Sequence, residues 1–438
     1  MTQELFQLAL NITDPWFISD LQFNIEAKRL DVYIDFKKGS TFSYEYIEYK
    51  TETKKETIDE KEVEVKTKIE IGRENFDNLK AYDTQDKRWR HLNFFEHECY
   101  LHARVPRVKL PNQKVKLIKT PWEGQSNGFT LLFEALLLQL CQAMPVNKVA
   151  KITNTSDDKL WSMLDRYITN TREYEDFEDI DAIGMDETSR AKGHEYISTF
   201  VDLLKRRTIF ITEGKDNTTV QRFAEDFKEH SGDIENIKNV SCDMSPAFIK
   251  GVKENLPQAE ITFDKFHILK IINEAVDKVR KEEVGANKLL KGTKYIWLKN
   301  YNNLTEKQKE QLNTLTMSNM NIKTIRAYNI RQSFQDIYQA STQEEFITYL
   351  NKWYYWATHS RLEPIVKAAK SVKNHWDGIV KWYESKINNG ILEGLNSVIQ
   401  AAKSKARGYK TFKNYKIIVY LLTGKLDFSL VNSKFREV

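Results

Sequence analysis

The clearest pattern of hydrophobic and polar positions lies near the middle of the chain. A short apolar run ends in Asp243, and Ser245 and Pro246 follow it in positions typical of a helix N-cap and a first helical residue. The predicted helix ends before a second strand, residues 260–263, which is followed by Asp264. The pattern predicts strand, helix and strand, with a carboxylate at the carboxyl end of each strand, where open α/β sheets place their ligands.

Asp243 has two interpretations. It could cap the helix, because Asp is a preferred N-cap residue. Ser245 is the better-placed cap in the sequence, so the pattern favours another role for Asp243.

Strand and helix patterns also precede this unit, after an acidic linker. The order of three strands, helix, strand, helix and strand is that of a ribonuclease-H-like core, in which the first and fourth strands are neighbours. This order predicts that Asp186, at the end of the first strand, lies beside Asp243. The preceding elements are predicted strands at residues 180–186, 194–204 and 207–213 and a predicted helix at residues 217–230.

Neighbouring carboxylates repel each other unless a cation lies between them, so such pairs hold Mg²⁺ or Mn²⁺. Two ions roughly 4 Å apart can activate an attacking hydroxyl and stabilise the leaving oxygen of a phosphodiester. A third carboxylate is then expected. Glu393 shares the polar side of a helix predicted at residues 391–406 with Asn396 and Gln400. Periodicity alone does not distinguish a catalytic Glu393 from a surface glutamate.

The amino-terminal region, residues 1–121, has mostly β-type patterns. A polar stretch rich in Lys and Glu, residues 51–61, is predicted to form a hairpin tip or insertion. The predicted strands are residues 29–36, 41–50, 62–71 and 97–110.

Three histidines and a cysteine in this region, His91, His97, Cys99 and His102, are close enough in sequence to suggest a metal site. Zinc sites with a single thiol and no Cys-x-x-Cys pair are less usual. The sequence favours polar and aromatic residues on a half-exposed strand.

Residues 122–172 have the pattern of a helix-turn-helix DNA-binding domain, whose last helix would enter a major groove. A small helical bundle would show the same spacing. The predicted helices are residues 129–142, 145–153 and 156–168.

Residues 271–380 are predicted to be a helical insertion before the last helix of the core. Their tryptophans are best explained by core packing. In the alternative interpretation, Trp297 stacks on an unpaired base.

The composition agrees with a multidomain α+β protein, because 438 residues predict two to four domains. No signal peptide is visible, and the most apolar stretch, residues 129–144, is too short for a membrane span. We expect a cytoplasmic protein. The three cysteines are far apart, which predicts free thiols.

The net charge of +5 is mild, but its distribution is uneven. Residues 401–416 contain six basic residues and no acid, which is typical of phosphate binding, although a solvated lysine-rich face is equally common. The basic residues are Lys403, Lys405, Arg407, Lys410, Lys413 and Lys416.

Several of these stretches together resemble the ISL-three family of bacterial insertion-sequence transposases, over nearly the whole chain. The most specific motifs are IGMDETSRAKGHEY (183–196), CDMSPAFIKGV (242–252), FDKFHILK (263–270) and GILEGLNSVIQAAKSKARGYKTFKNY (390–415). Two further stretches that carry the resemblance are WRHLNFFEHECYLHARVPRVKL (89–110) and GFTLLFE (128–134).

The resemblance implies a DDE transposase with a ribonuclease-H-like core. Its metal-binding carboxylates would be Asp186, Asp243 and Glu393, holding two Mg²⁺ or Mn²⁺ ions. Asp264 and His267 match a family signature and are expected to support the site. Residues 173–270 and 381–438 would form the core.

The chain departs from the family at its amino terminus. Family members usually carry two Cys-x-x-Cys pairs there, but residues 43–46 read SYEY and residues 110–113 read LPNQ. We therefore expect a β scaffold that binds no zinc. DNA contacts could persist through Arg104, Arg107, Lys109, Lys114 and Lys116.

The implied partners are double-stranded DNA, as the element's terminal inverted repeats and as target DNA, and no membrane. Pairing of two ends implies a homodimer or larger assembly on DNA, in the cytoplasm and at the nucleoid. The alternatives are a non-catalytic DNA-binding protein, such as a repressor, and a nuclease that cuts without joining.

Overall fold

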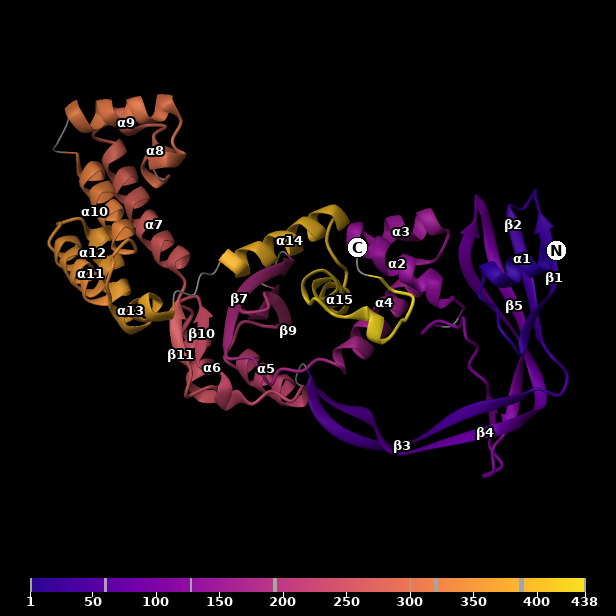
Figure 1. The fold of residues 1–438 in the computed structure, drawn as a ribbon. Coiled ribbons are helices and arrows are strands. Elements are labelled where there is room, and N and C mark those ends of the chain that lie inside the picture. The colour runs from indigo at the N-terminus through magenta and orange to yellow at the C-terminus, as the bar shows by residue number, and fades with distance from the viewer. Residues whose placement is uncertain are drawn as a thin grey trace. The chain divides into compact units, whose positions relative to one another are not determined.

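The computed structural model describes residues 2–58, 61–126, 128–191, 195–299, 301–318, 322–385 and 390–436. The chain forms two compact units, each with its own hydrophobic core (Figure 1). The first comprises Met1–Thr171 and Asp427–Val438, and the second comprises Arg172–Leu426. The last residues therefore belong to the first unit, although the sequence places them with the final helix of the core.

The first unit begins with a short helix and a six-stranded sheet. The strand order is β1-β2-β5-β4-β3, with β6 beside β5, and only β2 and β5 are parallel. Alternate residues of β2 and β5, such as Val32 and Leu101, are buried together with Trp16 and Trp89. The elements are α1 (Thr2–Ala9), β1 (Trp16–Asn24), β2 (Arg29–Phe36), β3 (Thr41–Ile58), β4 (Lys61–Phe94), β5 (His97–Lys109) and β6 (Val115–Leu117).

The β3 and β4 strands are much longer than the sequence predicts. The interpretation of residues 51–61 as a hairpin tip is wrong for most of that stretch, since β3 continues to Ile58 and pairs with β4 from Lys61. Residues 59 and 60 lie outside the described residues. Thr51, Thr53, Thr57 and Ile58 occur here among the charged residues, and the high strand propensity of Thr and Ile explains why a polar stretch still forms a strand.

Three helices follow the sheet in the first unit, as the sequence predicts. They are α2 (Leu131–Ala143), α3 (Val146–Thr153) and α4 (Asp157–Arg172). The α3 helix ends at Asn154, whose φ of 50° is the left-handed conformation that Asn tolerates better than most residues.

The second unit contains a five-stranded sheet in the order β11-β10-β7-β8-β9. Strands β7, β8 and β9 pair antiparallel, whereas β10 lies parallel to both β7 and β11. The predicted contact between the first and fourth strands of this region is therefore confirmed. The strands are β7 (Ala182–Ala191), β8 (Glu195–Asp202), β9 (Arg207–Glu213), β10 (Asn239–Cys242) and β11 (Glu260–Phe263).

Helices follow the strands as the sequence predicts. The helices between the strands are α5 (Thr218–Glu229) and α6 (Pro246–Asn255), and α14 (Gly390–Ala406) and α15 (Phe412–Thr423) contact β7 and β9. Phenylalanines at positions 200, 223 and 227 fill the core between the sheet and α5.

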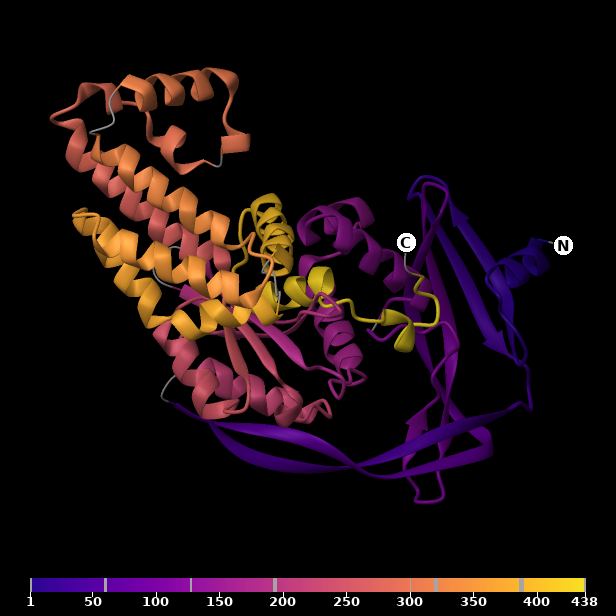
Figure 2. The ribbon, with the colours of Figure 1, turned by 60° about the vertical axis from the view of Figure 1, so that its left-hand side comes forward.

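A bundle of helices, orange in Figures 1 and 2, lies between β11 and α14 in the chain. No strand occurs among its described residues, as predicted. No helix in the described ranges is both long and apolar enough to cross a membrane. The bundle comprises α7 (Lys265–Val284), α8 (Lys294–Leu298), α9 (Glu306–Ser318), α10 (Lys323–Ile337), α11 (Gln343–Thr358), α12 (Glu363–Asn374) and α13 (Trp376–Ser385).

Candidate active site

The candidate site lies at one edge of the second sheet, where β10 and β11 end. The parallel register pairs Ser241 with Gly184, so two further residues along each strand bring Asp243 level with Asp186. Strand β7 does not end at Asp186, contrary to the sequence prediction. It continues to Ala191, because its second half pairs with β8 after β10 has ended.

Asp243 contacts the start of α6. Its Oδ1 accepts a hydrogen bond from the backbone N–H of Ser245 at 2.9 Å. Ser245 occupies the N-cap position, but its side chain makes no capping hydrogen bond, so the expectation that its hydroxyl caps the helix is wrong. The Asp243 carboxylate forms the local turn and still faces the charges of Asp186 and His267.

Asp264 and His267 form a pair at the start of α7. Asp264 is buried and is the N-cap of α7, with Oδ1 accepting from the N–H of Phe266 at 2.9 Å. Its Oδ2 lies 2.9 Å from His267 Nδ1. This hydrogen bond raises the pKa of His267, and the negative charges of Asp264, Asp186 and Asp243 raise it further. A protonated His267 would therefore face the carboxylates.

Asp186 is the most perturbed carboxylate of the site. Its pKa is raised to about 6, chiefly by burial and to a smaller extent by the charge of Asp243, while the charge of His267 opposes the shift. Burial and the charge of Asp243 also raise the pKa of Glu187. The negative charges on these acids thus destabilise one another in the absence of a cation.

The α14 helix contacts β7 along one of its faces. Asn396 Nδ2 donates a hydrogen bond to Asp186 Oδ2, and Gln400 Nε2 donates to Thr188 Oγ1 at 3.0 Å. One turn further, Lys403 Nζ donates to the Ser189 carbonyl oxygen at 2.8 Å.

The absence of a side chain at Gly184 allows this close approach. A Cβ at position 184 would lie 2.9 Å from a methyl group of Leu392 and 2.9 Å from one of Leu203. Leu392 is buried in this contact together with Val201 and Leu203.

Glu393 lies in the first turn of α14, three residues before Asn396, and is exposed. Residues three apart on a helix share a face, so Glu393 lies on the side of α14 that contacts β7. Over the described part of the chain, no three His, Cys, Asp or Glu side chains are close enough together to hold a metal ion. The structure thus brings together Asp186, Asp243 and His267 but not Glu393.

Trp297 packs in the helical core. Its side chain is completely buried, its Nε1 donates to Thr293 Oγ1 at 2.8 Å, and its ring meets Tyr328 edge to face. The position agrees with core packing, and an indole so placed offers no face to an unpaired base.

The histidines and cysteine of the first unit have separate contacts. His91 Nδ1 lies 2.8 Å from Thr130 Oγ1, and burial lowers the pKa of His91 to about 4. His102 Nε2 lies 2.5 Å from Asp31 Oδ1, and the ring of His97 packs at a tilt against that of Phe23. Burial raises the pKa of Cys99 to about 12, which disfavours the thiolate that zinc requires.

Of the basic residues predicted to bind DNA, some already have partners. Arg104 pairs with Asp35 and Arg107 with Asp83, while Lys114 donates to Tyr46 at 2.6 Å. Four of the five basic residues after Lys403 in the stretch 401–416 are exposed around the end of α14 and the start of α15, and Lys416 is half-buried. The exposed residues are Lys405, Arg407, Lys410 and Lys413.

The structure indicates a role in the site for two residues that the sequence does not predict as site residues. Glu187 follows Asp186 directly, and Asn396 lies one turn after Glu393. The adjacency of Asn396 to Glu393 on a polar helix face is a signal, but its partner Asp186 lies 210 residues away. Only the folded chain identifies that contact.

Comparisons with known proteins identify related sequences. The family model DDE_Tnp_ISL3, described as "Transposase", matches residues 183–419, and the model of the helix-turn-helix domain of transposase family ISL3 matches residues 118–168. The transposase for insertion sequence element IS1001 of Bordetella parapertussis is 27% identical over 341 residues, which cover 75% of this chain and 82% of that protein. The transposase for insertion sequence element IS1557 of Mycobacterium tuberculosis is 24% identical over 354 residues, which cover 74% of this chain and 79% of that protein.

The sheet with its acidic edge and the helix-turn-helix domain define the class, that of insertion-sequence transposases with a DDE domain. Because the catalytic-domain match covers more than half of the sequence, the chain belongs to the ISL3 family of transposases.

Proposed function

We propose that this chain cuts DNA at the ends of an insertion sequence and joins those ends to target DNA. The observation that carries the proposal is the pair of Asp186 and Asp243 on neighbouring parallel strands, within the region that matches the transposase family. Burial and the neighbouring charge of Asp243 raise the pKa of Asp186, and neighbouring carboxylates of this kind attract divalent cations.

The sheet of the second unit is assigned to a ribonuclease-H-like core. Its strand order, with three antiparallel strands followed by two strands added in parallel, supports the assignment. We assign residues 173–270 and 381–426 to this core and residues 271–380 to its helical insertion, because residues 427–438 belong to the first unit. Residues 122–172 and the zinc-free module of residues 1–121 bind the terminal inverted repeats.

Asp186, Asp243 and Glu393 are the proposed ligands of two Mg²⁺ or Mn²⁺ ions. Carboxylate oxygens are the ligands these cations prefer. When bound, the ions supply activation of the attacking oxygen and stabilisation of the leaving oxygen. Glu393 would complete the set from the helix that already contacts Asp186 through Asn396.

The other side chains of the site hold these groups in place. Asn396 orients Asp186, and Asp264 orients His267 through the hydrogen bonds described above. A positively charged His267 reduces the repulsion between Asp186 and Asp243 before a cation binds. Asp264 itself is occupied by capping α7, so it supports the site without serving as a ligand.

The reaction consists of two phosphoryl transfers. A water oxygen bonds to the phosphorus at the element's end as the P–O3′ bond breaks, which frees a 3′-hydroxyl. That hydroxyl then bonds to a target phosphorus, and one P–O bond of the target breaks. Neither step needs a covalent protein intermediate. Pairing of two ends requires a dimer or larger assembly on DNA.

The test uses labelled DNA that carries the terminal repeat flanking this gene, a target plasmid, and the native protein beside Asp243→Asn. We expect magnesium to support cleavage and joining by the native protein, and the variant to bind the same DNA without cutting it. Because the substitution changes one oxygen to nitrogen at a partly exposed turn, folding should be retained.

Other outcomes identify the alternatives. Cleavage without joined products would indicate a nuclease. Binding without cleavage under any divalent cation, by both proteins, would indicate a DNA-binding protein with a non-functional site. Equal cleavage by native protein and variant would contradict the assignment of Asp243.

A further inference from the structure

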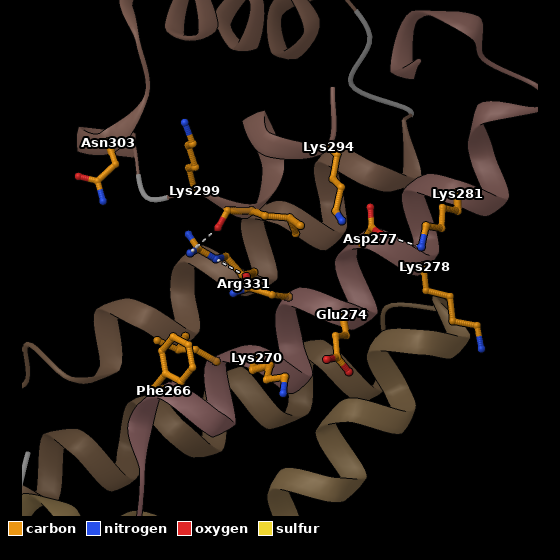
Figure 3. A pocket seen from close by; sticks show the side chains of 13 residues that line it. Phe266, Lys270, Glu274, Asp277, Lys278, Lys281, Lys294, Lys299, Asn303 and Arg331 are labelled. Carbon is orange, nitrogen blue, oxygen red and sulfur yellow. Dashed lines mark hydrogen bonds and ion pairs between the residues drawn. The ribbon is translucent and has the colours of Figure 1, made fainter. Parts of the chain in front are cut away.

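A basic pocket of about 640 Å³ lies in the helical bundle of the second unit (Figure 3). Helices α7, α8 and α10 contribute its lining. Five lysines and one arginine line it against only two carboxylates, Glu274 and Asp277. Its cationic residues are Lys270, Lys278, Lys281, Lys294, Lys299 and Arg331.

One face of α7 connects this pocket to the carboxylate site. Phe266, Lys270, Asp277 and Lys281 follow one another at intervals of one or two helical turns, so they share that face. Phe266 is adjacent to His267, and the centres of their rings are 5.8 Å apart. The pocket therefore begins one residue before the histidine that faces the catalytic acids.

The acidic residue in the middle of this face is already neutralised. Asp277 accepts from Arg280 Nε at 2.9 Å and lies 3.0 Å from Lys281 Nζ. These partners outweigh burial and lower the pKa of Asp277. Lys270, Lys294 and Lys299 form no ion pair with any described carboxylate, so the pocket carries an excess of positive charge.

Buried residues fix the positions of these cations. Trp297 and Ile296 anchor the short α8 helix in the core, and Lys294 and Lys299 lie at its two ends. Arg331 is 2% exposed, and its Nε donates to Asn273 Oδ1 at 3.0 Å. Its pKa is lowered by burial, so an anion in the pocket would stabilise its charge.

We infer that this pocket binds the phosphate backbone of the DNA strand that leads away from the carboxylate site. The inference rests on the proposed function, since it identifies where the helical bundle holds the DNA substrate. Lysine is a compact point charge that binds phosphate without reading sequence, so the pocket would position DNA and not select it. The exposed Phe266, at 57%, lies at the end nearest the acids.

The test compares two triple variants of the full chain with the same loss of charge. The first is Lys270→Ala with Lys294→Ala and Lys299→Ala. The control is Lys307→Ala with Lys352→Ala and Lys367→Ala, three exposed lysines on α9, α11 and α12 outside the pocket. The probe is double-stranded DNA with the terminal repeat and its flanks, and the measurement is affinity as a function of salt.

Each lost phosphate contact lowers the slope of log affinity against log salt by about 0.9, so three contacts lower it by about 2 to 3. We expect this change, with binding weaker on the order of tenfold or more, for the pocket variant, and a slope change below about 1 for the control. Equal losses in both variants would show a general effect of charge and overturn the inference.

A second measurement locates the DNA independently of affinity. The three native cysteines are buried, so a photocrosslinker can be attached at Lys299→Cys, with Lys352→Cys as the matched control. Labelled DNA should crosslink at position 299 and not at position 352. Absence of crosslinking at 299 would overturn the inference.

Different experimental results would overturn the inference and the proposed function. If the pocket variant binds, cuts and joins like the native protein, the pocket does not hold DNA, but the transposase proposal stands. If the native protein binds and crosslinks DNA but never cuts it, the pocket is confirmed and the catalytic proposal fails. If the native protein binds no DNA, both are overturned.

Discussion

Two carboxylates, one in each unit, have contrasting surroundings: Glu134 is buried and Asp186 is half-buried. Glu134, on α2, is completely buried and accepts hydrogen bonds from the N–H groups of Gln125 and Ser126 at 2.7 and 2.8 Å. The hydroxyl of Tyr167 donates to it at 2.7 Å, and Asn432 donates to that hydroxyl at 2.8 Å. Both oxygens of the Glu134 carboxylate therefore accept hydrogen bonds, and these bonds connect the helix-turn-helix region to the loop before it.

Asp186, by contrast, lies beside other acids. It accepts from the Glu187 N–H and from Asn396, but its surroundings and, to a smaller extent, the charge of Asp243 raise its pKa. Burial raises the pKa of Glu134 as well, but there the hydrogen bonds oppose it and no second acid takes part. A carboxylate surrounded by donors is structural, whereas a buried carboxylate facing another one is suited to a cation. Substitution of Asp186 should therefore mainly reduce catalysis, whereas substitution of Glu134 should mainly reduce stability.

The largest effect is expected on catalysis at the sheet edge. Asp186→Asn should reduce magnesium-dependent cleavage on the order of a thousandfold or more, because cation stabilisation of the transition state is worth several kcal/mol and each 1.36 kcal/mol is tenfold. Cleavage rates under single-turnover conditions measure this. Glu134→Gln is the matched control in the other unit, and a comparable loss of cleavage there, with DNA binding intact, would undermine the contrast.

The next largest effect is expected on stability at the other carboxylate. Glu134→Ala leaves two backbone N–H groups and the Tyr167 hydroxyl without their acceptor, so the free energy of unfolding of the first unit should fall by about 3 to 5 kcal/mol. Urea unfolding measures this. Glu96→Ala, at an exposed ion pair with Lys28, is the control and should leave the free energy of unfolding almost unchanged. A similar small cost at Glu134 would show that its contacts are unimportant.

A smaller effect concerns pH. The folded pKa of Asp186, about 6, exceeds its ordinary value of 3.8, so the folded state binds the proton more tightly. The stabilisation of the folded state by the protonated Asp186 carboxyl is therefore complete below pH 4 and is lost as the pH rises through 6. In metal-free buffer, Asp186→Asn should therefore increase the free energy of unfolding of the second unit at pH 7 to 8 by about 1 to 3 kcal/mol, and by nothing below pH 4.

Denaturant titrations of native protein and variant at several pH values measure this difference. His267 and Asp243 also face Asp186, but both are present in both proteins. If the difference in free energy of unfolding between the two proteins increased towards low pH, the raised pKa assigned to Asp186 would be wrong.

The smallest effect is expected for Asn396→Ala. Loss of its hydrogen bond to Asp186 should slow cleavage about tenfold, since a hydrogen bond to a charged group contributes about 1.5 to 3 kcal/mol. The same bond lowers the pKa of Asp186, so the pH profile of cleavage should also move to higher pH. Gln400→Ala, which removes the bond to Thr188, should leave the profile in place. An unchanged profile for Asn396→Ala would indicate a purely structural residue.

Much of the fold could be predicted from local patterns. The apolar runs before Asp243 and Asp264, the N-cap and proline at the start of α6, and the amphipathic helices of residues 129–168 depend on neighbours within a few positions. Their predicted boundaries therefore agree with the structure to within a few residues. The length of the hairpin formed by β3 and β4 could not be predicted, because strand pairing, not local polarity, determines how far its charged segment extends.

The sequence by itself determined the order of strands and helices, the positions of Asp243 and Asp264 directly after two strands and, through its motifs, the family. Only the tertiary structure decided which distant groups meet: Asn396 with Asp186, Leu392 with Gly184, and the lysines of α7 and α8 around one pocket. It also buried Trp297, which the sequence could not distinguish from a base-stacking residue. The physical reason is that periodicity records which face of an element is apolar, whereas burial and pKa depend on the elements packed against that face.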